Sequence, residues 1–145
     1  MHNMKTKTLR ASAIFLLYFL GFWALLGGFG LISDPTGASL KIPLDYLKGT
    51  SFEDYLIPGV ILFLANGISS IVIAISVARK VKNYPFFIMV QGMTLILWLT
   101  VQLFINKDFY APQWHITFYA IGLLLLFFGG IINAPKAKNT KELEK

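Results

Sequence analysis

Four long apolar runs dominate the pattern of hydrophobic and polar positions along the chain. They cover about Ala11–Ile32, Ile57–Ala78, Pro85–Asn106 and Trp114–Ile132, and none contains Asp, Glu, Lys or Arg. Each run has about 20 residues, so a helix with a rise of ~1.5 Å per residue would cross a hydrocarbon core roughly 30 Å thick. The pattern predicts an all-α fold, an integral membrane four-helix bundle forming a single domain over residues 1–145.

The long connection between the first two runs is expected to be ordered. Residues 33–37 read Ser-Asp-Pro-Thr-Gly, a strong turn signal, and Pro43 and Gly49 suit the start and the end of a short helix. Ser51 followed by Asp54 resembles a capping box, which would start the second helix at Phe52, with Pro58 bending it one to two turns later. We therefore predict helices over about 11–32, 52–78, 85–106 and 114–132, with a short helical outer cap between the first two.

The charges between the runs predict the topology. The net charge is +6, and if the helices alternate in direction, ten of the thirteen basic residues share one face of the membrane. These ten are Lys5, Lys7, Arg10, Arg79, Lys80, Lys82, Lys136, Lys138, Lys141 and Lys145. Cytoplasmic segments of membrane proteins carry such a surplus of Lys and Arg. We expect a multi-pass protein with both termini in the cytoplasm, and the same placement explains the basic charge without nucleic acid.

Several kinds of chemistry find no support in the sequence. The chain has no cysteine, which excludes disulfides, thiolate nucleophiles and Cys-ligated metals. Its two histidines, His2 and His115, form no cluster with metal-ligand spacing. His115 with Glu53 or Asp54 is the one set that could serve acid–base catalysis, and no ionisable residue lies at a helix centre for proton-coupled transport. We expect no enzyme, no catalytic residue, no metal and no cofactor.

Polar residues inside the runs share helix faces. At 100° per residue, Gln91, Trp98 and Gln102 fall on one face of the third helix, and His115 and Tyr119 share a face of the fourth. In the second helix, one face carries Gly59, Asn66 and Ser70. Amides and hydroxyls that face lipid are poorly satisfied, so these faces should point inward.

The expected depth of these residues suggests a pocket at the outer surface. With cytoplasmic termini, several polar and aromatic residues fall in the outer half or near the midplane, beneath an acidic outer loop. The candidate ligand-binding residues are Asn66, Trp98, Gln102, His115, Tyr119, Glu53 and Asp54. Two interpretations stay open: the set could line a ligand pocket, or it could serve helix-to-helix hydrogen bonding, interface anchoring and capping.

A resemblance supports the topology. The segments that carry it are Gly27-Gly28, Asp34-Pro35-Thr36-Gly37, Ile42-Pro43-Leu44, Leu47-Lys48-Gly49-Thr50-Ser51-Phe52 and Asp54-Tyr55-Leu56-Ile57-Pro58-Gly59. With these segments the chain resembles a family of small bacterial four-helix integral membrane proteins with no assigned activity. The helix count and the Gly/Pro-rich first outer loop are also similar to DoxX-like proteins. The resemblance implies four helices and a bacterial cytoplasmic membrane, and it implies no chemistry.

Two functions remain in competition. The first is a non-catalytic protein that binds a lipid or a small apolar ligand in an outward-facing pocket between helices. The alternative is an accessory, interaction or immunity-type membrane protein whose outer loop docks a protein partner. Membrane lipids, a membrane protein partner or a second copy of the chain are the partners that these functions imply.

The topology can be tested by cysteine labelling, because the chain has no native cysteine. A membrane-impermeant thiol reagent applied to intact cells should label Lys48→Cys and should leave Lys82→Cys unlabelled. The opposite labelling pattern would place the termini outside the cell.

Overall fold

The chain folds into helices and short turns. The computed structural model describes residues 2–143, with side chains for residues 4–134, and no β-strand occurs among them. The long elements are α1 (His2–Ser33), α2 (Leu56–Ile61), the π-helix η3 (Leu62–Ile68), α3 (Ser69–Ala78), α4 (Tyr84–Ile105) and α5 (Pro112–Leu143). Three short 3-10 helices are η1 (Ala38–Leu40), η2 (Leu44–Leu47) and η4 (Lys107–Phe109). Because α2, η3 and α3 are continuous, they form one span, and the predicted four-helix class is confirmed.

The predicted capping box is wrong, and the second span begins at Leu56 instead of Phe52. Ser51 caps no helix; instead the Thr50 hydroxyl oxygen accepts a hydrogen bond from the Phe52 amide. Asp54 acts later than expected, since its Oδ1 accepts from the Leu56 amide at 2.9 Å. Pro58 consequently lies in the first turn of the helix, where its missing N–H leaves no intrahelical hydrogen bond unmade.

The first and last helices are longer than their apolar runs. α1 begins at His2, well before Ala11, and α5 starts at Pro112 and continues beyond Ile132 to Leu143. An apolar run marks the part of a helix that suits hydrocarbon, and the backbone hydrogen bonds of the same helix can continue into the polar flanks. Apolarity therefore predicted the spans and underestimated the helices.

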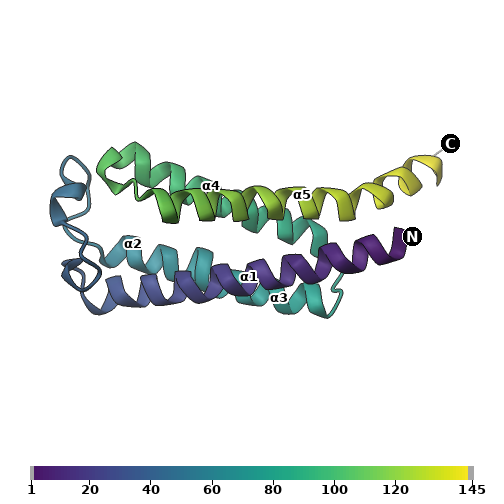
Figure 1. The fold of residues 1–145 in the computed structure, drawn as a ribbon, viewed down its shortest axis with the longest axis horizontal. Coiled ribbons are helices and arrows are strands. Elements are labelled where there is room, and N and C mark those ends of the chain that lie inside the picture. Colours follow the sequence, from purple (N-terminus) through teal and green to yellow (C-terminus); the bar gives the residue numbers. More distant parts are fainter. Residues whose placement is uncertain (1, 144–145) are drawn as a thin grey trace.

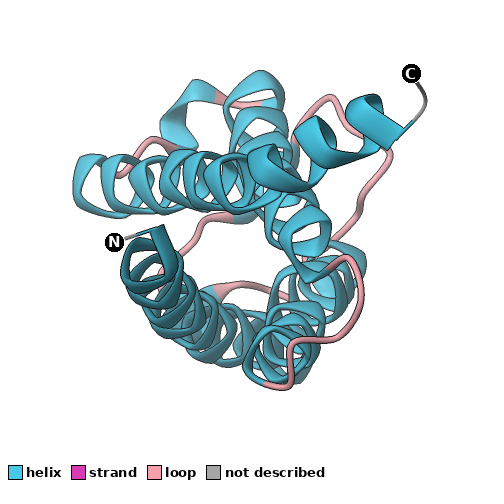
Figure 2. Ribbon diagram, turned by 90° about the vertical axis from the view of Figure 1, so that its right-hand side faces the viewer, coloured by secondary structure: helices cyan, strands magenta, loops and turns pink. Residues whose placement is uncertain are grey.

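The helices form two hairpins, which lie in two layers (Figure 1). The first hairpin pairs α1 with α2, η3 and α3, and the second pairs α4 with α5. The start of α1, the end of α5 and the turn 79–83 lie at one end of the molecule, which we call the terminal end (Figure 1). Segments 34–55 and 106–111 lie at the other end, the loop end. Seen from the terminal end, the helices surround a common centre (Figure 2).

The fold gathers basic residues at the terminal end, as the charge pattern predicted. Six of the ten belong to the part of the chain with described side chains, in the first turns of α1 and in the turn 79–83. The other four, Lys136, Lys138, Lys141 and Lys145, lie outside the residues whose side chains are described.

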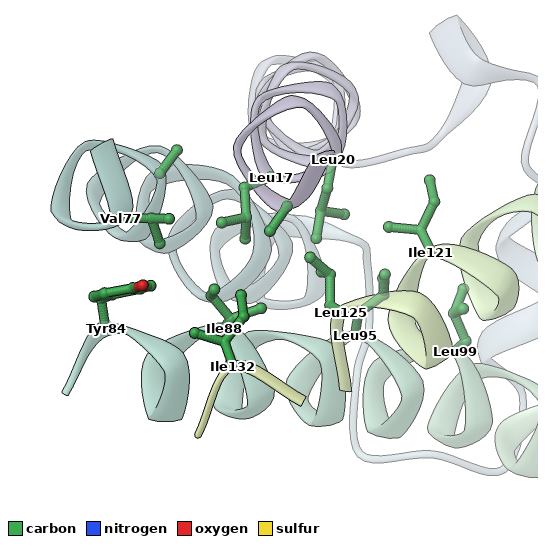
Figure 3. Packing of buried hydrophobic residues seen from close by; sticks show 12 residues of the cluster. Leu17, Leu20, Val77, Tyr84, Ile88, Leu95, Leu99, Ile121, Leu125 and Ile132 are labelled. Carbon is green, nitrogen blue, oxygen red and sulfur yellow. The ribbon is translucent and has the colours of Figure 1, made fainter. Parts of the chain in front are cut away.

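The main hydrophobic core joins the two hairpins in the terminal half. Leu17 on α1, Ile88 on α4 and Leu125 on α5 are fully buried there, and Val77 on α3 completes the contact (Figure 3). Further along α4, Leu95 and Leu99 mark the limit of this core toward the loop end. Buried side chains therefore hold the two hairpins together mainly in the terminal half of the molecule.

Within each hairpin, glycines let the backbones approach. A Cβ atom added at Gly28 of α1 would lie 2.7 Å from the backbone nitrogen of Phe63 in η3. A Cβ atom added at Gly92 of α4 would lie 2.6 Å from the carbonyl oxygen of Gly122 in α5. Small residues at such contacts allow close helix packing in membranes, so each hairpin is a tightly packed unit.

The outer surface of the helices suits a lipid environment. All four spans are long and apolar enough to cross a membrane, and only between 28% and 33% of the most apolar window of each is buried inside the protein. Large apolar side chains such as Phe15, Phe29 and Phe104 are exposed instead. An apolar surface of this extent requires a nonaqueous surrounding. The chain is a multi-pass membrane protein.

Two neighbouring glycines of α5 provide a test of this packing. A Cβ atom at Gly129 would lie 2.7 Å from the Pro85 carbonyl oxygen of α4, whereas one at Gly130 would meet nothing within 4 Å. We expect Gly129→Ala to lower the free energy of unfolding by about 1–3 kcal/mol, because backbone atoms must shift. Gly130→Ala is the matched control and should change it by less than about 0.5 kcal/mol. Unfolding in mixed detergent micelles measures both, and equal effects would contradict the packing.

Candidate functional site: a cavity at the loop end

A cavity of about 690 Å³ separates the two hairpins at the loop end. It lies beyond the main core, between the loop-end parts of α1, α4 and α5. Its aromatic lining consists of Trp23, Tyr46, Trp98, Phe109, Trp114 and Phe118. Its polar lining is small and consists of Lys41, Gln102, Asp108 and His115. A volume in this range, with mostly apolar walls and a few polar groups, is typical of small-molecule sites.

A smaller cavity of about 140 Å³ adjoins the first. Trp98, Gln102 and Phe109 line both cavities. The two spaces are therefore neighbours around the same side chains, and a change at Trp98 affects both.

The two loops at this end form a joint cap. Phe109 of the second loop lies edge-on to Tyr46 and Tyr55 of the first, with ring centroids 5.0 Å and 6.3 Å apart. Leu47 and Tyr55 are buried beneath the cap and pack with Leu31 of α1. Because Tyr46 and Phe109 also line the large cavity, the cap forms its roof.

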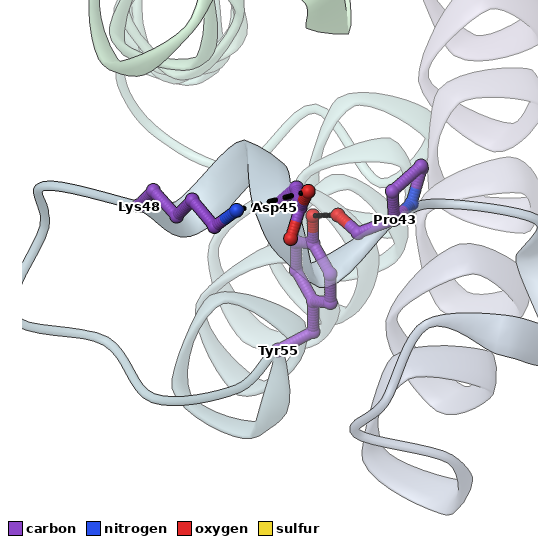
Figure 4. Close-up of polar contacts among 4 residues, drawn as sticks. All are labelled: Pro43, Asp45, Lys48 and Tyr55. Atoms are coloured by element: carbon purple, nitrogen blue, oxygen red, sulfur yellow. Dashed lines mark hydrogen bonds and ion pairs between the residues drawn. The ribbon is translucent and has the colours of Figure 1, made fainter.

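Local hydrogen bonds fix the shape of the cap. The Tyr55 hydroxyl donates to the Pro43 carbonyl oxygen at 2.7 Å, and the exposed Asp45 and Lys48 form an ion pair at 3.0 Å (Figure 4). Asp34 closes the first turn: its Oδ1 accepts from the Thr36 hydroxyl and its Oδ2 from the Ser39 amide. These bonds, first that from the Thr36 hydroxyl, hold the pKa of Asp34 below its ordinary value. The turns predicted for this segment are present.

His115 contributes the most buried polar side chain of the cavity wall. It lies in the first turn of α5 and is 5% exposed. Its Nδ1 lies 3.2 Å from the Ala111 amide nitrogen and 3.3 Å from the Ala111 carbonyl oxygen. That carbonyl already accepts from the His115 amide at 2.9 Å, so we assign Nδ1 as the acceptor of the Ala111 amide and the ring proton to Nε2. Within the described part of the chain, Nε2 is buried and has no hydrogen-bond partner.

A second polar cluster lies away from the cavity, between η3 and α4. Gln91 of α4 is 2% exposed; its Oε1 accepts from the Ser69 hydroxyl, and its Nε2 donates to the Ala65 carbonyl oxygen and to Asn66 Oδ1. The π-helix makes this possible, because the Ser69 amide donates to the Leu64 carbonyl and leaves the Ala65 carbonyl accessible to a side chain. This cluster cross-links the two hairpins.

Three of the seven predicted site residues line the cavity: Trp98, Gln102 and His115. They lie on α4 and α5, and their side chains face the interior of the bundle, as we predicted for the polar faces of these helices.

The other four predicted residues lie elsewhere. Asn66 is fully buried but belongs to the Gln91 cluster, and the Tyr119 hydroxyl pairs with the Thr100 hydroxyl at 3.0 Å between α5 and α4. Glu53 is exposed on the loop, and Asp54 binds the Leu56 amide at the start of α2. None of these four lines the cavity, because each either bridges helices or serves the loop.

Several residues that line the cavity were not among the predicted site residues. Trp23 of α1 and Trp114 of α5 meet edge to face at a centroid distance of 5.2 Å, and Phe118 stacks beside Trp114. A signal was present, since Trp23, Trp98 and Trp114 all belong to the loop-end parts of their helices. Tryptophan at this depth is also typical of an anchor at the membrane interface, so depth alone does not distinguish the two roles.

The chain matches no family model, no curated protein and no solved structure. The geometry of the site therefore carries the functional argument. Among the described residues no group of three or more His, Cys, Asp or Glu side chains could hold a metal ion. The cavity offers an apolar volume with aromatic walls, the neutral side chains of Gln102 and His115, and the charged Lys41 and Asp108 at its roof.

Tyr55 allows a test of the cap. We expect Tyr55→Phe to lower the free energy of unfolding by about 1–3 kcal/mol, because the Pro43 carbonyl then loses its partner. Tyr110→Phe is the control, since the Tyr110 side chain is half exposed. Detergent unfolding at neutral pH compares the two variants, and an equally small loss in both would contradict a structural role for the Tyr55 hydroxyl.

The same residue gives the cap a defined pH dependence. Burial, followed by the neighbouring Tyr46, raises the pKa of Tyr55 from 10.0 to about 12. A raised pKa means that the stabilisation is complete below pH 10 and is lost as the pH rises through about 12. The phenolate absorbance of the wild-type protein minus that of Tyr55→Phe should titrate near 12; a midpoint near 10 would contradict the burial.

Proposed function

We propose that this protein binds a lipid or a small apolar molecule in the cavity at the loop end, without catalysis. The observation that carries the proposal is the cavity of about 690 Å³ between the hairpins, lined by six aromatic side chains and few polar ones. Glycine contacts pack the helices tightly within each hairpin, so the void lies between the hairpins, where large side chains meet. A space of this size and character favours an apolar occupant.

We further propose a location in a bacterial cytoplasmic membrane, with the terminal end in the cytoplasm. The basic residues near the ends of α1, α3 and α4 support this orientation through the positive-inside bias. The cavity would then lie in the outer half of the membrane. The bacterial assignment rests on the resemblance to small bacterial four-helix membrane proteins.

The accessory-protein alternative predicts a different result from the same material. An interaction subunit needs no occupant in the cavity, and its partner would dock on the cap formed by the two loops. Retention of a small molecule therefore distinguishes the two functions.

Native mass spectrometry from mild detergent tests the proposal. We expect the wild-type protein to retain a co-purifying lipid, and Trp98→Ala to reduce the retained fraction about fivefold or more, because an aromatic contact at the centre of a binding site is lost. Phe104→Ala is the matched control on the same helix, since Phe104 is 91% exposed and lines neither cavity.

Equal thermal stability of both variants would show that retention, and not folding, has changed. A wild-type protein that retains no lipid, or equal retention in both variants, would contradict the proposal and favour the accessory role.

A further inference from the structure

Two residues of the cavity wall, His115 and Gln102, have side-chain polar groups that the described residues leave unsatisfied. We assign the ring proton of His115 to Nε2, because Nδ1 is the acceptor of the Ala111 amide and the Ala111 carbonyl is already bonded to the His115 amide. Nε2 is then a buried donor without a partner in the described part of the chain. Gln102 reaches the same cavity from α4, and its side-chain amide makes no hydrogen bond to the described residues. A buried N–H without an acceptor costs free energy, so a molecule that supplies an acceptor gains more than a hydrocarbon does.

We infer that the occupant carries a neutral hydrogen-bond acceptor, a carbonyl oxygen, at the end of an apolar body. This inference rests on the proposed function and names the ligand class. A carbonyl oxygen accepts hydrogen bonds and donates none, so it can satisfy the N–H of His115 or of Gln102, and its two lone pairs allow it to accept two donors. The aromatic walls, including Trp98, accommodate the apolar body.

The charges around the cavity favour a neutral head. Lys41 and Asp108 both line the roof with opposite sign, so the roof offers no net charge to an ionised group. The wall below contains no Asp, Glu, Lys or Arg, and an ion would lose its hydration there without a counter-charge. A ketone or an ester therefore fits better than a carboxylate.

The tryptophans provide a signal specific to this site. The chain has three tryptophans, and all three line the cavity. Bromine quenches tryptophan fluorescence on contact, so brominated probes report occupancy directly. The probes are a dibrominated fatty-acid methyl ester and a dibrominated alkane of equal chain length, titrated into the protein in lipid nanodiscs.

We expect saturable quenching by both probes, with the ester half-saturating at a mole fraction about 2- to 10-fold lower than the alkane in the wild-type protein. In His115→Phe, which keeps a ring of similar size, the half-saturating mole fraction of the ester should rise about 2- to 10-fold, while that of the alkane stays unchanged. Gln102→Leu provides a second variant that does not disturb the Ala111 contact, and it should act in the same direction. Saturable alkane quenching in each variant shows that the cavity persists.

The outcomes separate this inference from the proposed function. Saturable but equal binding of ester and alkane to the wild-type protein would overturn the carbonyl assignment and leave the apolar binding function standing. An ester preference that survives in both variants would overturn the roles of His115 and Gln102. Non-saturating quenching by both probes in the wild-type protein would mean contact with bulk lipid alone and would overturn both proposals.

Discussion

Close backbone contact at glycines is the constraint from which the rest of this structure follows. Gly28 against Phe63 and Gly92 against Gly122 bring each pair of helices so near that a single added carbon would meet backbone atoms. Each hairpin is consequently a compact unit with little space inside it. The two cavities at the loop end lie between the hairpins, where side chains set the separation. Leu17, Ile88 and Leu125 fill that separation in the terminal half, and the loop half keeps its cavity.

Two glutamines of α4 show how the same side chain serves different purposes at different depths. Gln91 is satisfied by a carbonyl and two side chains of the facing span, and a local change from α- to π-helix supplies the free carbonyl. Gln102 makes no such bonds and lines the cavity. An amide that the protein satisfies is a cross-link, and one that it leaves unsatisfied is available to another molecule.

The sequence predicted the fold well because apolar length and helical span are nearly the same physical quantity in a membrane. Three of the seven candidate site residues, Trp98, Gln102 and His115, line the cavity, because the 100° spacing holds along the regular helices α4 and α5. Asn66 lies within the π-helix Leu62–Ile68, where the spacing of 100° per residue does not hold. Tyr119 has the predicted inward face, yet Thr100 takes its hydroxyl. Whether a polar side chain finds a hydrogen-bond partner depends on the residues of the facing helix. The spacing of residues along one helix gives its faces and does not give those partners.

The absence of formal charge from the apolar runs has an electrical consequence. Moving one elementary charge through 100 mV of membrane potential is worth about 2.3 kcal/mol, and this work is what voltage-sensing proteins use. The four runs contain no Asp, Glu, Lys or Arg, so a relative movement of the two hairpins carries no such charge through the field. Occupation of the cavity by an uncharged molecule would then proceed equally in energised and de-energised membranes. The supply of that molecule, and not the voltage, would set how much of the protein is loaded.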